Sequence, residues 1–263
     1  MARPIIALVT DFGSRDHYVG AMKGVMLGVC PEAVLVDITH DIAAHDVLGG
    51  ALELAAAYRH FPSGTVFLSV VDPGVGSGRR ALVAEAGEHQ FVAPDNGILS
   101  IVLREALPRR VVELTEPRYA RQIVSRTFEG RDRFAPAAAW LAKGVDLQAL
   151  GRPANDICCL TVPEAVMAGG GIAGTVLRID RFGNLVTNID RASVDRLASL
   201  GSIQVWAGAV LVEKVVDTYA DVPSGDLCVL FGGTDHLEVA VHGGSAAERL
   251  CLSRGAAVRV TVC

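Results

Sequence analysis

A short acidic segment directly follows the first apolar run of this 263-residue chain. It contains Asp11 and Asp16, with Gly13 between them. A carboxylate such as Asp11 can accept two hydrogen bonds from a ribose diol, and Asp16 can pair with an ammonium group. Either aspartate can instead cap a helix or stabilise a turn. Asp11, which comes at the end of a predicted strand, is the better candidate for a binding residue.

A second segment combines a carboxylate, glycines and fixed positive charge. It begins at Asp72 and ends at Arg79 and Arg80, with three glycines in between. Glycines permit close backbone approach, and such a loop beside arginines can cradle a phosphate. However, neither the G-x-x-x-x-G-K-[ST] pattern nor a helix-opening G-x-G-x-x-G pattern is present. The segment therefore leaves three interpretations open: a catalytic loop, a phosphate-handling loop and a turn with two solvated arginines.

Two later segments also carry polar side chains in compact patterns. Glu129 and Asp132 alternate with arginines beside Phe128, just before a predicted helix. Asp180 and Asn184 flank a tight turn between two predicted strands. Glu129 can equally be a surface carboxylate, Asp132 a helix cap, and the Asp180 turn ordinary hairpin chemistry.

Composition and motifs exclude several functional classes. A net charge of −5 and a pI near 5.8 argue against nucleic acid as a partner. The seven histidines show no H-E-x-x-H or similar spacing, so we expect no metal site, and no G-x-S-x-G elbow is present. The apolar run from Ile5 to Val9 is too short to cross a bilayer and lacks the layout of a signal peptide. Six cysteines without a C-x-x-C pair favour reduced thiols in a cytoplasmic protein.

The elements that position the first three segments alternate between strand and helix. Such alternation predicts a mainly parallel sheet with helices on its faces, and open sheets of this kind bind ligands at the carboxyl ends of their strands. Asp46 is a candidate helix cap. The predicted strands are Ile5–Thr10, Ala33–Ile38, Thr65–Val71, Ala81–Ala86, Gln90–Ala93 and Arg110–Leu114, and the predicted helices are Tyr18–Val29, Asp46–Tyr58, Gly97–Glu105 and Arg131–Lys143.

The pattern changes after about residue 150. An irregular stretch ends in Gly169-Gly170-Gly171, which we interpret as a linker. Short β-rich runs separated by turns then predict a small sandwich or barrel. The expected architecture is an α/β domain over residues 1–158 and a smaller all-β domain over residues 172–263. The predicted strands of the second domain are Thr175–Asp180, Leu185–Ile189, Ile203–Trp206, Leu211–Val216, Cys228–Phe231, Leu237–Val241 and Ala257–Val262.

Nearly the whole chain resembles one family, the S-adenosyl-L-methionine (SAM) hydroxide adenosyltransferases with the related fluorinases and chlorinases. The halide-using enzymes carry another residue in place of Asp72, and the fluorinases carry an insertion that is missing here between residues 81 and 93. The chain therefore resembles the water-using branch. The motifs that carry the resemblance are Thr10-Asp11-Phe12-Gly13, Val71-Asp72-Pro73-Gly74-Val75-Gly76, Ala93-Pro94-Asp95-Asn96-Gly97, Thr127-Phe128 with Gly130-Arg131-Asp132, and Phe182-Gly183-Asn184 with Thr187-Asn188.

The resemblance implies hydrolysis of SAM to adenosine and L-methionine by activated water attacking the ribose 5′ carbon. The branch uses an Asp, Arg and His trio, which corresponds here to catalytic Asp72, Arg79 and Glu129, with glutamate replacing the histidine. Asp11 and Phe128 are expected at the ribose and Asp16 at the methionine ammonium. Gly130 is a further substrate-binding residue by the same resemblance, and Asp180 with Asn184 is expected at the methionine or ribose end.

The resemblance further implies a homotrimer with sites between subunits, a small-molecule substrate and no cofactor, and we expect no membrane partner. His45, Thr234 and His242 stand where the family usually has other residues near the substrate. Together with Glu129, they leave an alternative function open, a nucleoside- or sulfonium-binding protein with little turnover or with a shifted substrate.

Overall fold

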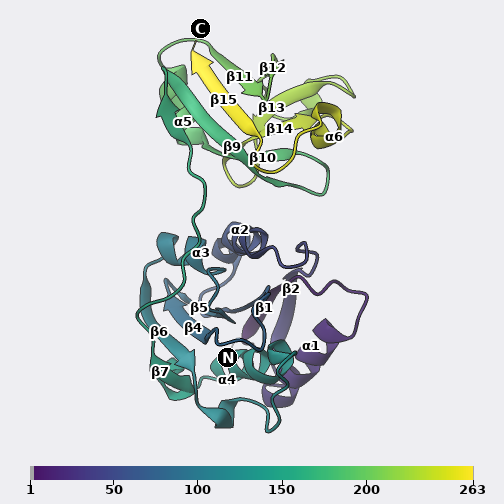
Figure 1. Ribbon diagram of the computed structural model, residues 1–263. Coiled ribbons are helices and arrows are strands. Elements are labelled where there is room, and N and C mark those ends of the chain that lie inside the picture. The colour runs from purple at the N-terminus through teal and green to yellow at the C-terminus, as the bar shows by residue number, and fades with distance from the viewer. Residues whose placement is uncertain (1–2, 263) are drawn as a thin grey trace. The chain divides into compact units, whose positions relative to one another are not determined.

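The computed structural model describes residues 3–262 and divides the chain between Thr161 and Val162. Each side of that division is a compact unit with a sheet of its own, here called the N-terminal and the C-terminal unit (Figure 1). Among the described residues, no helix is long and apolar enough to cross a membrane.

A seven-stranded sheet forms the centre of the N-terminal unit, in the order β2-β1-β3-β5-β4-β6-β7. The first four strands in this order are mutually parallel, and the remaining pairings are antiparallel. The central strand β3 is buried along its whole length, as expected for a strand covered on both faces. The strands are β1 (Ile5–Thr10), β2 (Val34–Thr39), β3 (Val66–Val70), β4 (Ala81–Ala86), β5 (His89–Pro94), β6 (Pro108–Leu114) and β7 (Gly151–Pro153).

Helices cover both faces of this sheet (Figure 1). Helix α1 (Tyr18–Val29) packs against α4 (Ala135–Ala142), which contacts β1, β3 and β5. On the other side, α2 (Val47–Ala57) packs against α3 (Ser100–Glu105). Asp46 caps α2 as predicted, because its side chain accepts a hydrogen bond of 3.0 Å from the backbone nitrogen of Gly49.

The sheet brings two of the predicted segments to one edge. Thr10 at the end of β1 is the register partner of Val70 at the end of β3. Because these strands are parallel, Asp11 and Asp72 leave the sheet at the same edge and in neighbouring loops. This is the edge where ligands bind in open α/β sheets.

The C-terminal unit is an antiparallel sheet in the order β12-β11-β15-β9-β10-β14-β13, with β8 pairing to β9. The predicted combination of an α/β unit and an all-β unit is thus confirmed. Two short helices, α5 (Arg191–Ala198) and α6 (Ala246–Leu250), were not predicted. The strands are β8 (Val166–Ala168), β9 (Gly171–Ile179), β10 (Leu185–Asp190), β11 (Ile203–Ala207), β12 (Val210–Val212), β13 (Leu227–Phe231), β14 (His236–Val241) and β15 (Ala257–Val262).

Two local predictions differ from the structure. The glycine run is a hairpin turn rather than a linker, because Ala168 pairs with Gly171 and both Gly169 and Gly170 have positive φ angles. The helix predicted over Arg131–Lys143 starts as a π-helix, Gly130–Phe134, before continuing as α4. Asp132 lies fully buried in this π-helix and does not cap α4.

Candidate active site

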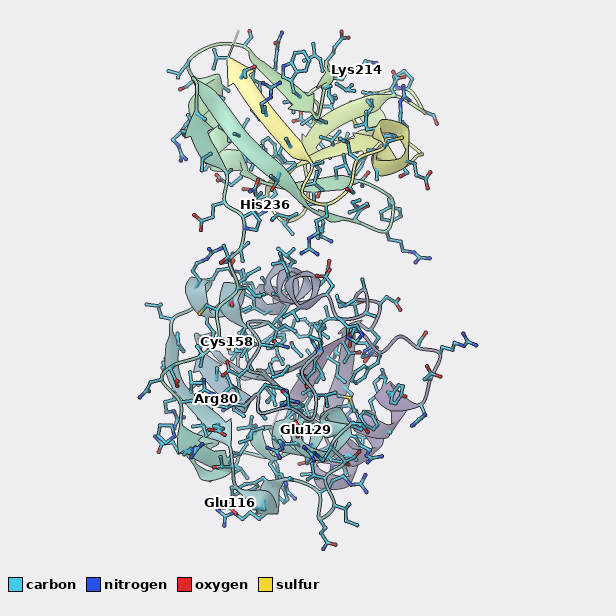
Figure 2. The ribbon with its side chains drawn as sticks, in the orientation of Figure 1. Arg80, Glu116, Glu129, Cys158, Lys214 and His236 are labelled. Carbon is cyan, nitrogen blue, oxygen red and sulfur yellow. The ribbon has the colours of Figure 1, made fainter. Side chains whose placement is uncertain are left out.

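Arg79 connects the two carboxylates predicted to be catalytic. Its Nε atom donates to both carboxylate oxygens of Asp72, at 2.9 Å each, and its Nη2 atom also contacts Asp72. The same Nη2 atom donates to Glu129 Oε2 at 2.6 Å. The structure therefore brings Asp72, Arg79 and Glu129 into one hydrogen-bonded cluster, the arginine between two carboxylates (Glu129 is labelled in Figure 2).

A glycine allows the two loops of this cluster to approach each other. Gly76 has a φ angle of +77°, and a Cβ atom there would lie 2.5 Å from the carbonyl oxygen of Arg126. No other residue fits that contact without moving one of the loops. The turn that contains Asp72 and Arg79 thus packs directly against the segment leading to Glu129.

Burial makes these charges interact strongly. The side chains of Asp72, Arg79 and Glu129 are only 5%, 10% and 13% exposed. Burial by itself lowers the pKa of Arg79, but the hydrogen bonds and charges of Asp72 and Glu129 outweigh it, so the pKa lies above its ordinary value. The guanidinium also stacks over the ring of Phe134, at 5.1 Å from its centroid. Arg79 is thus a permanent cation at this site.

Arg80, the second arginine of the glycine-rich loop, pairs with two other carboxylates. Arg80 donates to Asp95 at 2.8 and 2.6 Å and to Asp156 at 2.7 Å. Asp95 in turn accepts a 2.8 Å hydrogen bond from the backbone nitrogen of Cys158, close to the end of the unit (Figure 2). Because both arginines of the glycine-rich loop are bound to carboxylates, the phosphate-handling interpretation is not favoured.

Backbone groups of the segment after β2 hold Asp11 and the loop after β1 in place. Asp11 Oδ2 accepts a hydrogen bond of 2.9 Å from the backbone nitrogen of His45, a residue in the left-handed region with a φ angle of 68°. On the other side, Gly13 donates to the carbonyl of His40 at 2.8 Å, and the His40 ring lies 2.8 Å from the Thr10 hydroxyl. Asp11 is therefore fixed in orientation, whereas Asp16 is exposed.

Aromatic rings line the space between these loops. Phe128 is buried, with its ring centroid 5.1 Å from that of Tyr18 and 6.1 Å from that of Phe12. Gly130 follows in the buried start of the π-helix, where a Cβ atom would lie 3.4 Å from Phe12 and from Met22. Phe12 and Tyr18 were not predicted as site residues, although Phe12 lies between Asp11 and Asp16 and Tyr18 begins the helix that follows them.

The C-terminal unit carries the Asp180–Asn184 turn. Asp180 Oδ1 accepts hydrogen bonds from the backbone nitrogens of Phe182 (2.8 Å) and Asn184 (2.9 Å), and Asn184 Nδ2 donates to Asp180 Oδ2 at 2.9 Å. The hairpin interpretation is thus correct for the backbone. A pocket of about 590 Å³ is nevertheless lined by Asp180, Phe182 and Asn184, together with Tyr219. Phe182 is 75% exposed beside it.

A buried carboxylate lies behind this pocket. The Tyr219 hydroxyl donates to Glu238 Oε2 at 3.1 Å, and Glu238 is 5% exposed. Burial raises the pKa of Glu238, the hydrogen bond from Tyr219 lowers it and repulsion by Asp180 raises it, with a net increase. Burial and the Glu238 charge raise the pKa of Tyr219 to about 12. Neither residue was predicted, because each stands alone in an otherwise ordinary turn or strand.

No cluster of three or more histidine, cysteine, aspartate or glutamate side chains within residues 3–262 has the geometry of a metal site. Of the predicted site residues, seven lie in the N-terminal unit: Asp11, Asp16, Asp72, Arg79, Phe128, Glu129 and Gly130. Asp180 and Asn184 belong to the C-terminal unit.

Comparison with known proteins gives matches over both units. Residues 6–151 match the family model of the SAM hydroxide adenosyltransferase N-terminal domain, and residues 174–259 match that of the C-terminal domain. An (R)-S-adenosyl-L-methionine hydrolase of Thermus thermophilus is 38% identical, with 98% of this chain and 99% of that protein covered. One of Salinispora tropica is 39% identical, with 98% of each covered. The crystal structure of an uncharacterized conserved protein from Thermotoga maritima superimposes with a TM-score of 0.92, at 34% identity, over 97% of this chain and 99% of that one.

Proposed function

Since the chain belongs to the family of SAM hydroxide adenosyltransferases, we propose that it is an enzyme that hydrolyses SAM to adenosine and L-methionine. The observation that carries this proposal is the Arg79 guanidinium, which is bound to both Asp72 and Glu129 in a nearly dry cluster. Full-length relatives that hydrolyse (R)-SAM support the same substrate.

The reaction requires an activated water and no acid for the leaving group. Water oxygen forms a bond to the ribose 5′ carbon while the bond from that carbon to sulfur breaks, and its electron pair stays on sulfur as a neutral thioether. The water loses its proton to a carboxylate. Asp72 orients the water, Arg79 holds the two carboxylates in place by hydrogen bonds, and Glu129 acts as the polar partner or base. Alignment alone lowers the barrier by up to roughly 7–11 kcal/mol.

Substrate recognition is assigned to the residues around this cluster and in the second unit. Asp11, fixed by His45, binds the ribose hydroxyls, and Phe128 forms a wall of the ribose site. Asp16 pairs with the methionine ammonium, and Gly130 leaves room beside Phe12. The family resemblance assigns Asp180 and Asn184 to the methionine or ribose end, and the pocket beside them supports this assignment.

The resemblance also supports a homotrimer with sites between subunits and no cofactor, and the lack of a C-x-x-C pair among the six cysteines favours a cytoplasmic location. The assigned residues fall in both units. Mass measurement by light scattering tests the trimer.

The decisive experiment incubates the purified protein with SAM, with and without chloride, and follows the nucleoside products by mass spectrometry. We expect adenosine and methionine in equal amounts from the wild type, none from Asp72→Asn, and no 5′-chloro-5′-deoxyadenosine. In water labelled with oxygen-18, the adenosine 5′ oxygen should carry the label.

The alternative, a binding protein with little turnover, predicts tight binding of SAM or adenosine without product. Calorimetry on the same samples separates the two, because the enzyme releases products whereas the binding protein retains its ligand. Equal turnover by the wild type and Asp72→Asn would refute the assignment of Asp72.

A further inference from the structure

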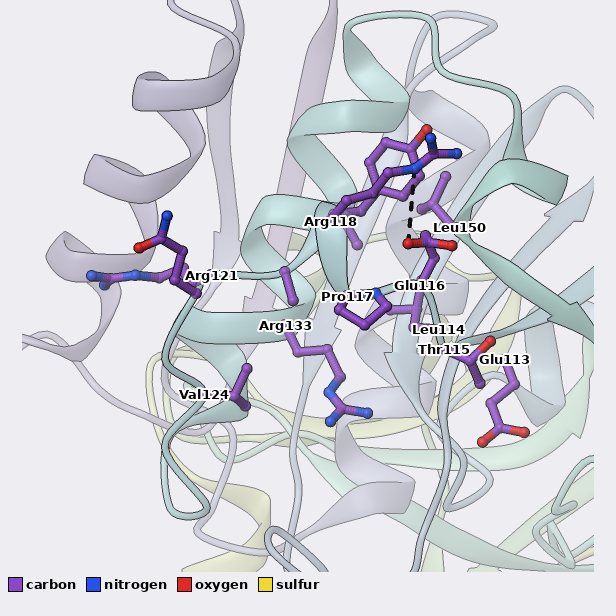
Figure 3. A pocket seen from close by; sticks show the side chains of 14 residues that line it. Glu113, Leu114, Thr115, Glu116, Pro117, Arg118, Arg121, Val124, Arg133 and Leu150 are labelled. Carbon is purple, nitrogen blue, oxygen red and sulfur yellow. Dashed lines mark ion pairs between the residues drawn. The ribbon is translucent and has the colours of Figure 1, made fainter.

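The N-terminal unit contains a pocket that plays no part in the proposed reaction. It has a volume of about 640 Å³ and lies beyond the carboxyl end of β6, between the 3₁₀ turn Pro117–Tyr119, the following segment and the start of α4 (Figure 3). Strand β6 runs antiparallel to β4, which runs antiparallel to β5, so β6 is parallel to β1, β3 and β5. The pocket therefore opens at the same sheet edge as the Asp11 and Asp72 loops.

Three arginines line this pocket: Arg118, Arg121 and Arg133. Figure 3 shows their side chains at separate points around it, with Arg118 joined to Glu116 by a dashed line. Five N–H donors in a fixed planar fork make each arginine suited to a carboxylate or phosphate.

None of the three has a close carboxylate partner among the ion pairs of the described residues. Arg118 lies 3.9 Å from Glu116, Arg121 lies 3.6 Å from Asp132 and Arg133 lies 3.8 Å from Glu129. These distances exceed those of hydrogen-bonded ion pairs.

Two of these carboxylates already have stronger partners. Asp132 accepts hydrogen bonds of 2.6 and 2.8 Å from Arg131, and Glu129 accepts one of 2.6 Å from Arg79. Donor capacity of the pocket arginines is therefore unused.

The acidic lining of the pocket does not cancel this positive charge. Glu113 is paired with Arg152, outside the pocket lining, at 2.9 Å. Glu116 is then the other acidic side chain of the lining, and it faces the positive charge of three arginines. The rest of the lining includes apolar side chains, among them Leu114, Val124 and Leu150. Such a pocket suits a molecule with one anionic group and one apolar part.

We propose that this pocket binds a small organic anion, whose carboxylate or phosphate group is attracted by the combined positive charge of Arg118, Arg121 and Arg133 and whose apolar part contacts Leu114, Val124 and Leu150. Arg133 also faces Glu129, so the bound anion lies next to the candidate active site without belonging to it.

The test uses calorimetry with three probes: phenyl phosphate, benzoate and inorganic phosphate, each at constant ionic strength. Phenyl phosphate should bind about tenfold or more tightly than inorganic phosphate, because the ring buries apolar surface. Comparison with benzoate shows whether the pocket prefers phosphate or carboxylate.

The variant Arg118→Gln/Arg121→Gln should weaken phenyl phosphate binding at least about tenfold. Both side chains are well exposed, at 65% and 47%, so the fold should be preserved, as circular dichroism can verify. Arg109→Gln is the matched control, because Arg109 is also 65% exposed, with its acidic partner Glu85 at 3.8 Å. It should bind like the wild type.

Adenosine and methionine together should not displace phenyl phosphate from the wild type. Displacement, or unchanged affinity in the double variant, would place the anion outside this pocket and overturn the proposal. Absence of binding by all three probes at millimolar concentration would overturn it as well. Neither outcome bears on SAM hydrolysis, which is measured separately.

Discussion

The guanidinium of Arg79 donates a hydrogen bond of 2.6 Å to Glu129, a residue fifty positions later in the chain. Arg79 also binds Asp72, so one cation separates two carboxylates that would otherwise repel each other. The position of Arg79 therefore allows both carboxylates to lie in one nearly buried cluster.

We expect Arg79→Gln to lower kcat about 100-fold or more, because the variant loses the cation and the guanidinium fork that hold Asp72 and Glu129 together. Arg79→Lys keeps the charge but not the fork, and should lower kcat less. Initial rates with saturating SAM measure the three proteins side by side. A wild-type kcat in Arg79→Gln would contradict the role of Arg79.

Glu129 stands where the family resemblance implies a histidine, so substitutions of Glu129 test whether a glutamate can replace it. Glu129→Gln keeps the shape but removes the charge, and should lower kcat about 100-fold if the carboxylate is a base. Glu129→His should retain part of the activity, because the imidazole can accept a proton at the same place. Single-turnover rates with saturating SAM distinguish these variants. If Glu129→Gln were as active as the wild type, Glu129 would have no catalytic function.

Gly76→Ala should disrupt the contact between the two catalytic loops. The added methyl group would lie 2.5 Å from the Arg126 carbonyl at a φ angle of +77°. We expect a loss of about 1–3 kcal/mol in unfolding free energy and a reduced kcat. Gly78→Ala is the control, because a Cβ atom there meets nothing within 4 Å and its φ angle is not positive. Urea denaturation and turnover should both distinguish the two variants.

Glu238→Gln should change how stability depends on pH. The pKa of Glu238 lies above that of the unfolded chain, mainly through burial, so the folded state holds this proton more tightly. The stability that this proton provides is complete below about pH 4.3 and is lost as the pH rises through the folded-state pKa. Glu238→Gln has no proton to lose at this position. The free energy of unfolding of the variant, minus that of the wild type, should therefore increase with pH. Urea denaturation at several pH values measures the difference, with the exposed Glu213→Gln as a charge-matched control. A constant difference would contradict the raised pKa.

The strands of both units were largely predictable, because β-branched runs bounded by turn residues distinguish them. The predicted limits of β1, β4 and β15 are those of the structure, as are those of α1. Helices α5 and α6 are short, and their buried side chains, Val194 and Leu197 in α5 and Ala246 in α6, are too few to distinguish a helix from a turn. The π-helix was also missed, because an extra residue per turn leaves no mark on composition.

The site was predictable where it follows a strand. Asp11 and Asp72 could be assigned to one sheet edge from alternating elements alone, and the structure agrees. The hydrogen bond between Arg79 and Glu129 could not be predicted, because it depends on how two loops pack against each other. Tyr219 and Glu238 are joined only by folding of the C-terminal unit, and neither lies in a motif.

The division into two units has a practical consequence for spectroscopy. The chain contains two tryptophans, Trp140 in α4 and Trp206 in β11, and so one in each unit. Replacing either by phenylalanine leaves a fluorophore that reports on a single unit. Unfolding of each half can then be followed by emission separately, and agreement between the two transitions tests whether the chain unfolds cooperatively.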